Sequence, residues 1–323
     1  MLQTIKSRLG KPLQLECRAT CRTVCRASNG LHYLPVALED MSGPVTAYFV
    51  SSRKIPTPKL KPGQQVSVTL RLEQMGSSPF VRILWLKAIN NGVSAPVQAI
   101  PASWCPHPEL LSVLQRVIDA LSYTPLIQFT EDFFNCDELV RAFVRIPGSV
   151  DCHHTHAAGL LAHSIDCARR VWGFLSTEDP VEREAAVIAA LFHDIGKIRT
   201  LTPEGRYQRS AMLMDHRAFT LEILSPFLAS LDRADPDMSD LLRYVWTWSP
   251  TENRRDPLAS VAIAVQAADA YSAKKDAEQR AFSTKENWQQ RATHRSHGPI
   301  RHFWRRRPVG MSMRQMQARE PRD

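Results

Sequence analysis

The stretch that decides the fold is Ala189-Ala190-Leu191-Phe192-His193-Asp194-Ile195-Gly196-Lys197, in which an apolar run ends in a histidine and an aspartate side by side. Apolar residues at three- and four-residue steps over residues 182–192 predict a helix. Gly196 stands where a helix would end, so His193 and Asp194 occupy its last turn. Burying an imidazole beside a carboxylate is costly without a partner, and both groups are good ligands for first-row metals. The dipeptide therefore indicates a divalent cation, provided that other ligands lie elsewhere in the chain.

Two further segments carry candidate ligands for such an ion. His163 lies on an amphipathic helix that the apolar spacing predicts after residue 159. Asp269 is a lone carboxylate in the small and apolar helix predicted from Pro257 to Ala273. Because ionised aspartate is almost never buried without a partner, this residue needs a cation. His216, near the start of a helix predicted for residues 212–229, is a further candidate, although a histidine that bonds only to the backbone is the alternative.

Taken in order, these residues resemble a known signature. His163, then His193-Asp194 with Gly196 and Lys197, then Asp269 resembles the H…HD…D signature of the HD-domain metal-dependent phosphohydrolases, over roughly residues 105 to 280. The resemblance implies a divalent ion, Mn²⁺, Mg²⁺ or Fe²⁺, held by His163, His193, Asp194 and Asp269.

The entry into the first ligand helix resembles two branches of this superfamily. His153-His154…Gly159-Leu160-Leu161-Ala162-His163 is similar to the entry of the YhaM-type 3′–5′ exoribonucleases and of the HD-bearing relaxase-like (TraI-type) proteins of conjugative elements. HD enzymes with two ions often place a histidine where His216 stands, which implies His216 as a further metal ligand. The exonuclease branch also places a His pair before the aspartate helix, whereas no histidine lies between His216 and His294 here. One ion is therefore the safer expectation.

The implied chemistry is hydrolysis of a phosphate ester by metal-activated water. We expect Asp194 to hold the ion and orient the water, and Lys197 to neutralise charge on the phosphoryl oxygens. The alternative for Lys197 is an interaction with the helix C-terminus, worth only ~0.3–1 kcal/mol. The loop of His153, His154 and His156 is predicted to supply a phosphate contact or a proton to the leaving group, and we assign this role to His154. A polar loop without a role in catalysis is the alternative.

Residues 1–95 are predicted to form an OB-like β-barrel. Apolar and polar residues alternate over residues 13–19, 33–38, 45–50, 66–72 and 80–88, as is typical of short strands in a small Greek-key barrel. The turns at Leu38–Gly43 and Lys61–Val66 resemble those of an OB-fold, and an OB-fold ahead of an HD domain is the arrangement of the YhaM-type nucleases. Cys17, Cys21 and Cys25 recur at every fourth residue, on one face of a predicted strand. We interpret them as half-buried thiols in preference to a zinc cluster.

The chain as a whole is predicted to be a multidomain α and β protein. The OB-like barrel is followed by a linker of residues 96–106, rich in proline, and by an all-α HD domain of residues 107–284 with seven helices. The second of these helices is predicted from Glu131 to Arg145. Residues 285–323 form a basic tail, which we expect to be disordered on its own past about Pro299.

Charge points to a polyanionic partner. The net charge is +9 and the sequence pI about 9.4, with most of the excess in the basic tail. Single-strand-binding surfaces combine aromatic platforms with basic side chains, which selects as nucleic-acid contacts Tyr33, Tyr48, Arg71, Trp304, Arg305 and Arg306. The alternatives are that the aromatic rings fill the barrel and that the arginines only solubilise the tail. Scattered cysteines and the lack of a long apolar run favour reduced thiols in the cytoplasm and argue against a membrane span; the oligomeric state is left open.

The sequence thus favours a metal-dependent phosphodiesterase that hydrolyses single-stranded nucleic acid, RNA in preference to DNA, with a 3′–5′ exoribonuclease-like activity. A nucleic-acid-binding relaxase-like or accessory protein of a conjugative element, with a weak or structural HD site, is the alternative. A nucleotide phosphohydrolase is the third interpretation.

Overall fold

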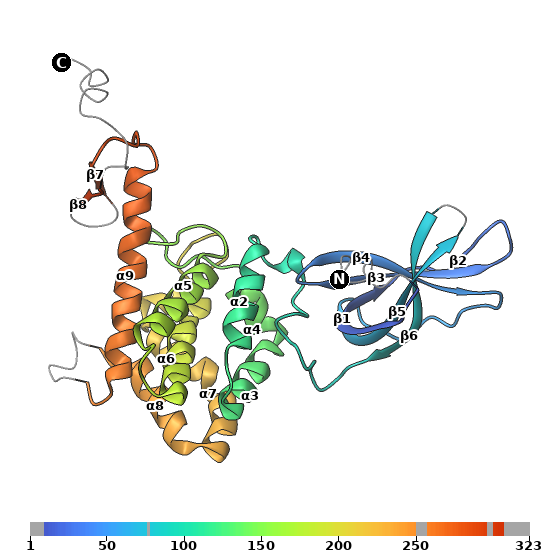
Figure 1. Ribbon diagram of the computed structural model, residues 1–323, viewed down its shortest axis with the longest axis horizontal. Helices are drawn as coiled ribbons and strands as arrows, with labels where there is room; N and C mark the ends of the chain where they lie inside the picture. Colours follow the sequence, from blue (N-terminus) through green and yellow to red (C-terminus); the bar gives the residue numbers. More distant parts are fainter. Residues whose placement is uncertain (1–9, 76–77, 250–256, 296–299, 307–323) are drawn as a thin grey trace.

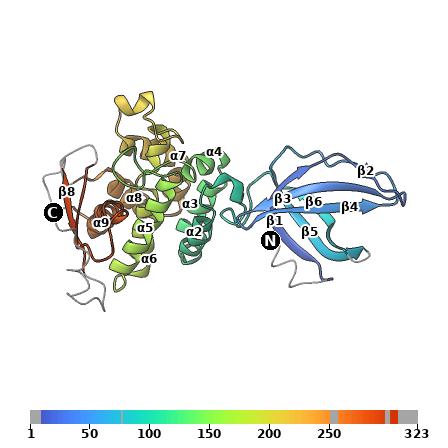
Figure 2. The same cartoon turned by 90° about the horizontal axis from the view of Figure 1, so that it is seen from above.

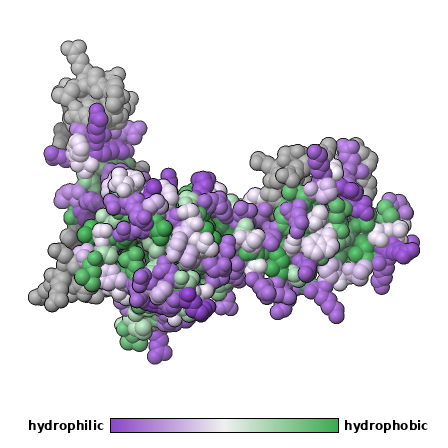
Figure 3. Space-filling model, turned by 60° about the horizontal axis from the view of Figure 1, so that its bottom comes forward, coloured by the Kyte–Doolittle hydropathy of each residue, from purple (hydrophilic) through white to green (hydrophobic). Residues whose placement is uncertain are grey.

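The computed structural model describes residues 10–75, 78–249, 257–295 and 300–306. A β-sheet region stands at one end of an elongated molecule and a helical region at the other (Figure 1). On the face seen in Figure 3, hydrophilic side chains surround smaller hydrophobic patches on both regions. Within the described part of the chain, no helix combines the length and the apolar character needed to cross a membrane.

The sheet is built from β1 (Leu13–Cys21), β2 (Cys25–Arg26), β3 (His32–Asp40), β4 (Gly43–Ser51), β5 (Gln64–Met75) and β6 (Ser78–Ala88). The strands lie in the order β1-β5-β6-β4-β3-β2, and β1 also pairs with β3. This extra pairing joins five strands into a ring, in which β4 and β6 are parallel and the other neighbours antiparallel. Alternate residues of β3, Leu34, Val36 and Leu38, are fully buried inside the ring.

The five predicted strands are confirmed as β1 and β3 to β6. The short strand β2 was missed, and it changes the interpretation of the cysteines, because Cys25 lies on β2 while Cys17 and Cys21 lie on β1. The prediction that the three share one strand is therefore wrong. Cys17 is buried and the other two are half-buried. Among the described residues, the three do not form a group with metal-binding geometry.

The segment predicted as a linker is packed against the helices. Val97 and Ile100 belong to the helical core, and Trp104, in a 3₁₀ turn of Ala102–Trp104, is 9% exposed. The Arg18 guanidinium of β1 lies 4.4 Å from the centre of the Trp104 ring and pairs with Asp137. Sheet and helices are therefore joined by buried contacts.

The helical region contains α2 (Glu109–Asp119), α3 (Thr124–Phe134), α4 (Asp137–Phe143), α5 (Gly159–Phe174), α6 (Pro180–Phe192), α7 (His216–Ala234), α8 (Pro236–Thr247) and α9 (Ser260–Phe282). Figure 2 shows α9 as the helix farthest from the sheet, with β8 beyond it. The 3₁₀ turns η2 (Ile195–Arg199) and η3 (Arg209–Met212) lie between α6 and α7. Phe192, at the end of α6, packs with its ring centre 4.6 Å from that of Phe133. This aromatic core fixes the position of the His193–Asp194 corner.

The helix predicted from Glu131 to Arg145 is wrong in one respect, because it is broken between α3 and α4. The Asn135 amide donates to the carbonyl of Glu131 at 3.0 Å and accepts from the backbone N–H of Val93 at 2.9 Å. Such side-chain bonds compete with helix continuation.

Part of the tail predicted to be disordered is also folded. Strands β7 (Arg291–His294) and β8 (Arg301–Trp304) form an antiparallel hairpin. Ala292 and Phe303 pack on the C-terminal end of α9 at Ala277, Ala281 and Phe282, and this packing offsets the cost of ordering the hairpin. The predicted tail beyond residue 306 lies outside the described residues.

Candidate metal centre

Four predicted ligands from three separate helical segments converge on one point. His163 on α5 places Nε2 at 3.2 Å from Nε2 of His193 and 3.2 Å from Oδ1 of Asp269 on α9. Asp194 Oδ2 lies 3.5 Å from His163 Nε2 and 3.4 Å from His193 Nε2. Ligands bound at ~2.0–2.2 Å to one ion stand about 3.0–3.6 Å apart. His193 Nε2 and Asp269 Oδ1 stand 3.9 Å apart, and the Lys197 ammonium lies 2.5 Å from Asp194 Oδ2. These donors therefore converge on the place of one divalent cation and would close around it by small shifts.

A close approach of η2 to α7 shapes the corner. A Cβ on Gly196 would lie 1.7 Å from the carbonyl oxygen of His216, so only glycine fits, and its N–H donates to Thr220 Oγ1 at 3.1 Å. The sequence had given this glycine the role of ending a helix. Its larger effect is to bring His216 to the site, with Nε2 3.0 Å from Asp194 Oδ1. His216 thus contacts Oδ1 of Asp194, whereas Oδ2 of the same carboxylate faces His163 and His193.

The charges at the centre suit metal binding. Burial would raise the pKa of Asp194, but the Lys197 ammonium and the imidazoles of His193 and His216 hold that pKa well below its usual range. Burial likewise acts to raise the pKa of Asp269, and hydrogen bonds from His163 and His193 hold it below its usual value. Both carboxylates are therefore ionised, as ligands must be.

The two histidines differ in their pKa. Burial lowers the pKa of His163, which keeps its ring neutral and able to donate a lone pair. For His193 burial acts in the same direction, but the neighbouring carboxylates of Asp194 and Asp269 outweigh it and raise the pKa to about 9. The His193 ring would lose a proton when it binds an ion. Its Nδ1 donates to the carbonyl of Ala190 at 2.7 Å, so Nε2 is the atom that becomes free.

Lys197 is held within the centre. Its ammonium lies 2.5 Å from Asp194 Oδ2 and donates to the carbonyl of Gly148 at 2.8 Å, and its side chain is 13% exposed. The predicted interaction of Lys197 with phosphoryl oxygens stays a prediction. The observed contacts give it a further role, which is to neutralise and orient Asp194.

Cys167 lies near the centre but outside the predicted ligand set. Its Sγ is 3.7 Å from His163 Nε2 and 3.8 Å from His163 Nδ1. Its Sγ also lies within 4.8 Å of ligand atoms of His163, His193 and Asp269, which form a candidate metal-binding group with it. The sulfur is nearly equidistant from both nitrogens of the His163 ring, so in this conformation it lies off the direction in which Nε2 would bind an ion. Burial raises the pKa of the Cys167 thiol, which keeps it protonated.

The histidine loop, residues 153–158, lies over the ligands. His154 Nε2 is 3.2 Å from Ser272 Oγ, and its backbone N–H donates to Asp276 Oδ2 at 3.0 Å. His153 has its ring centre 4.9 Å from that of His163, and within the described structure its buried Nδ1 lacks a hydrogen-bond partner. The predicted role of the loop of His153, His154 and His156 was assigned to His154, whereas the orphaned nitrogen belongs to His153. An orphaned imidazole nitrogen beside the ligands fits a site completed by an ion, its water or a substrate oxygen.

The predicted nucleic-acid residues fall in two places. Tyr33 and Tyr48 lie on β3 and β4, with ring centres 6.4 Å apart, and Phe80 of β6 is 6.4 Å from Tyr48. They line a cavity of about 310 Å³ on the sheet, which we call the aromatic groove. Arg71, predicted beside them, is paired with Glu73.

On the β7–β8 hairpin, the predicted nucleic-acid residues differ in exposure and in their contacts. Trp304 is 63% exposed and Arg306 is also exposed. Arg305 instead donates to the carbonyls of Gln289 at 3.0 Å and Glu286 at 2.6 Å, and its guanidinium lies over Phe282. Arg305 therefore holds the hairpin together, which reduces its freedom to bind a phosphate.

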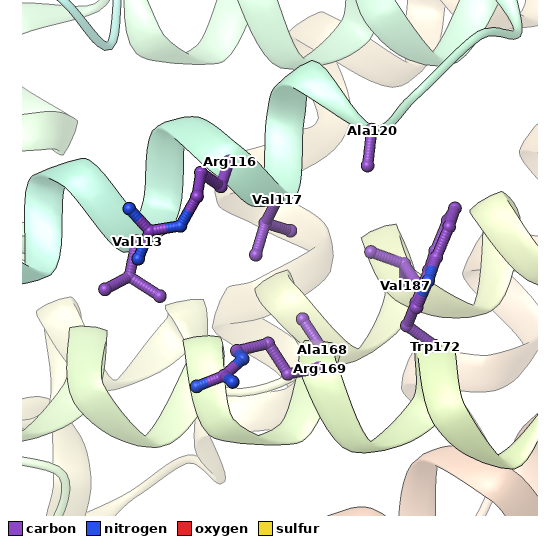
Figure 4. A pocket seen from close by; sticks show the side chains of 8 residues that line it. All are labelled: Val113, Arg116, Val117, Ala120, Ala168, Arg169, Trp172 and Val187. Atoms are coloured by element: carbon purple, nitrogen blue, oxygen red, sulfur yellow. The ribbon is translucent and has the colours of Figure 1, made fainter.

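A cavity of about 340 Å³ lies apart from this centre, between α2, α5 and α6 (Figure 4). Its walls include Val117, Trp172 and Val187, with Arg116 and Arg169 beside them. Successive residues of an α-helix are turned by about 100° around its axis, so Arg169 and Trp172 lie on the side of α5 away from His163. The cavity holds none of the predicted ligands.

Comparison with known families agrees with the geometry. Residues 153–274 match the family model of the HD domain. The match contains all the predicted metal ligands and begins at His153, the first residue of the histidine loop. Residues 153–274 are therefore similar to the HD domain, the domain of the metal-dependent phosphohydrolases. No curated protein and no solved structure gives a significant match to the chain.

Proposed function

We propose that this protein is a metal-dependent phosphodiesterase that hydrolyses single-stranded nucleic acid, with a 3′–5′ exoribonuclease-like activity. The observation that carries the proposal is the convergence of His163, His193, Asp194 and Asp269 within the span of one ion's ligands. Mn²⁺, Mg²⁺ and Fe²⁺ suit this mixed imidazole and carboxylate set.

The residues at the centre divide the chemical work. A bound ion supplies water of lowered pKa as a nucleophile near neutral pH. Asp194 holds one oxygen toward His163 and His193 and the other toward His216. Asp269 is 45% exposed and forms the solvent-facing side, so a phosphate can approach there.

The ring of strands supports a nucleic-acid substrate. We propose that it is an OB-type barrel, a fold that binds oligonucleotides on the face of its second and third strands. In chain order the second and third strands of the ring are β3 and β4, which carry Tyr33 and Tyr48. Every base has a π-face, so these rings offer stacking without sequence preference. The exposed Trp304 and Arg306 of the hairpin add a second contact.

The test uses full-length protein reconstituted with Mn²⁺ and three kinds of substrate: end-labelled single-stranded RNA, the matching DNA, and mononucleotides. We expect RNA to be shortened progressively from its 3′ end. Turnover of mononucleotides alone would refute the proposal in favour of a nucleotide phosphohydrolase.

The aromatic groove is tested separately by binding. Tyr33→Ala and Tyr48→Ala should each weaken RNA binding by ~1–3 kcal/mol, the usual contribution of one stacked base. Phe174→Ala is the matched control, because Phe174 is 52% exposed on α5 and outside the groove. If all three variants bind RNA as the wild type does, the groove does not bind nucleic acid.

One observation favours a second candidate function. The Lys197 ammonium already neutralises Asp194, as in a site where an ion pair replaces a metal. Such an ion pair is consistent with a structural HD site, as in the alternative of a relaxase-like or accessory protein. Binding of nucleic acid without any cleavage, in protein that also fails to bind Mn²⁺, would support it.

A further inference from the structure

Helix α9 supplies more to the metal centre than Asp269. Asp269, Ser272 and Asp276 follow one another at three and four residues, so they lie on one face of the helix. Ser272 is 1% exposed and Asp276 has a side-chain exposure of 13%. This face meets α5 and the histidine loop.

Ser272 lies between two imidazoles. Its Oγ is 3.2 Å from His163 Nδ1 and 3.2 Å from His154 Nε2. A hydroxyl can donate one hydrogen bond and can also accept. Ser272 can therefore donate to one of the two imidazoles and must accept from the other. The requirements of the metal site decide which direction holds.

The direction follows from His163. Nε2 faces the other ligands and carries no proton when an ion is bound, so in the ion-bound protein the proton of the neutral ring is on Nδ1. Nδ1–H donates to Ser272 Oγ, and the hydroxyl then donates to His154 Nε2. The remaining proton of His154 is on Nδ1, which faces Asp276 Oδ1 at 3.9 Å.

The backbone of the histidine loop has an unusual conformation at His154. His154 has φ +47°, in the left-handed region that residues with a side chain seldom adopt. Asp276 accepts the His154 N–H at 3.0 Å, and the Gly148 N–H donates to the His154 carbonyl at 2.8 Å. A Cβ on Gly159 would lie 1.9 Å from that carbonyl, so the glycine permits the approach. Asp276, Gly148 and Gly159 therefore fix the backbone of His154, and with it the position of its imidazole.

We propose that Ser272 is a positioning residue that selects the Nδ1–H tautomer of His163, with His154 and Asp276 holding the Ser272 hydroxyl in the required direction. His154 in this arrangement acts through Ser272 and does not contact substrate. Partners that fix the far nitrogen of a ligand histidine commonly change metal affinity 10- to 100-fold. The inference rests on the metal site of the proposed function.

The first test measures Mn²⁺ affinity by isothermal titration calorimetry on the full chain. Ser272→Ala should weaken binding ~10- to 100-fold, and Ser272→Thr, which keeps the hydroxyl, should retain most of the affinity. Ser164→Ala is the matched control: Ser164 is fully buried beside His163, and its hydroxyl lacks a partner within the described structure. Equal affinity in Ser272→Ala and Ser164→Ala would overturn the proposal.

A second test needs no variant that might fail to fold. Long-range ¹H–¹⁵N correlation spectra of the wild type loaded with diamagnetic Mg²⁺ report which ring nitrogen of His163 is protonated, with the ring signals assigned through bonds from the backbone. We expect Nδ1–H, and Nε2–H would overturn the proposal. A wild type that binds no Mn²⁺ would instead refute the proposed function, so the two failures are distinguishable.

Discussion

Removal of Asp194 should separate its role in metal binding from its role in stability. In the metal-free protein, Asp194→Ala leaves the Lys197 ammonium, 13% exposed, with the carbonyl of Gly148 as its one remaining partner among the described residues. Loss of one member of a buried ion pair costs about 3–5 kcal/mol. The remaining carbonyl contact favours the lower end, about 3 kcal/mol, which for a domain of this size lowers the Tm by roughly 6–12 °C.

The double variant Asp194→Ala/Lys197→Met removes both charges and should recover most of that loss, because apolar replacement of a buried pair is often neutral. Circular dichroism melts in chelator measure the stability, and calorimetry with Mn²⁺ measures the affinity. Both variants should fail to bind Mn²⁺ and to hydrolyse RNA. An Asp194→Ala protein that melts with the wild type, or a double variant that melts no higher than the single one, would refute the reasoning.

Three further predictions concern other parts of the molecule. Gly159→Ala would place a Cβ 1.9 Å from a carbonyl of the histidine loop, so it should lower both the Tm and Mn²⁺ affinity, as melts and calorimetry would show. A thiol reagent at pH 8 should modify the exposed Cys152 first and leave Cys17 unreacted until unfolding, because burial raises the pKa of Cys17 to about 12; mass spectrometry identifies the labelled site. Hydrogen bonds from Arg243 lower the pKa of Asp232 to about 2, so the stability it contributes is present above pH ~4 and is lost as pH falls toward 2; Asp232→Asn should flatten this part of the acid unfolding curve.

The candidate metal ligands could be predicted because their chemistry is unusual for their surroundings. Asp269 was selected as a carboxylate buried in an apolar helix; its side chain is 45% exposed, so its place beside His163 and not its burial supports the prediction. The His193–Asp194 pair lies at a buried corner, where a carboxylate needs a partner. The strands could be predicted because alternation of apolar residues depends only on neighbours in the chain.

What could not be predicted depends on contacts between distant residues. The break before α4 comes from Asn135, whose partner Val93 is 42 residues away. The hairpin at the end of the chain is ordered because Phe303 meets Phe282 and Ala281 of α9. His153 and His154 are adjacent residues of the same type, so the sequence does not separate their roles. The packing of α9 brings Ser272 to His154, whereas the buried Nδ1 of His153 has no hydrogen-bond partner within the described structure.

The length of α9 connects these corrections to the proposed function. The apolar pattern predicted a helix that ends at Ala273, but α9 continues to Phe282. The added turns contain Asp276, which holds the histidine loop, and Ala281 and Phe282, on which the β7–β8 hairpin packs. Lys274 also lies 4.3 Å from the centre of the Phe303 ring. One helix therefore carries the candidate ligand Asp269, the residue proposed to position His163, and the support of the basic hairpin. A strand of nucleic acid bound by that hairpin would thus be held by the same rigid element that holds Asp269.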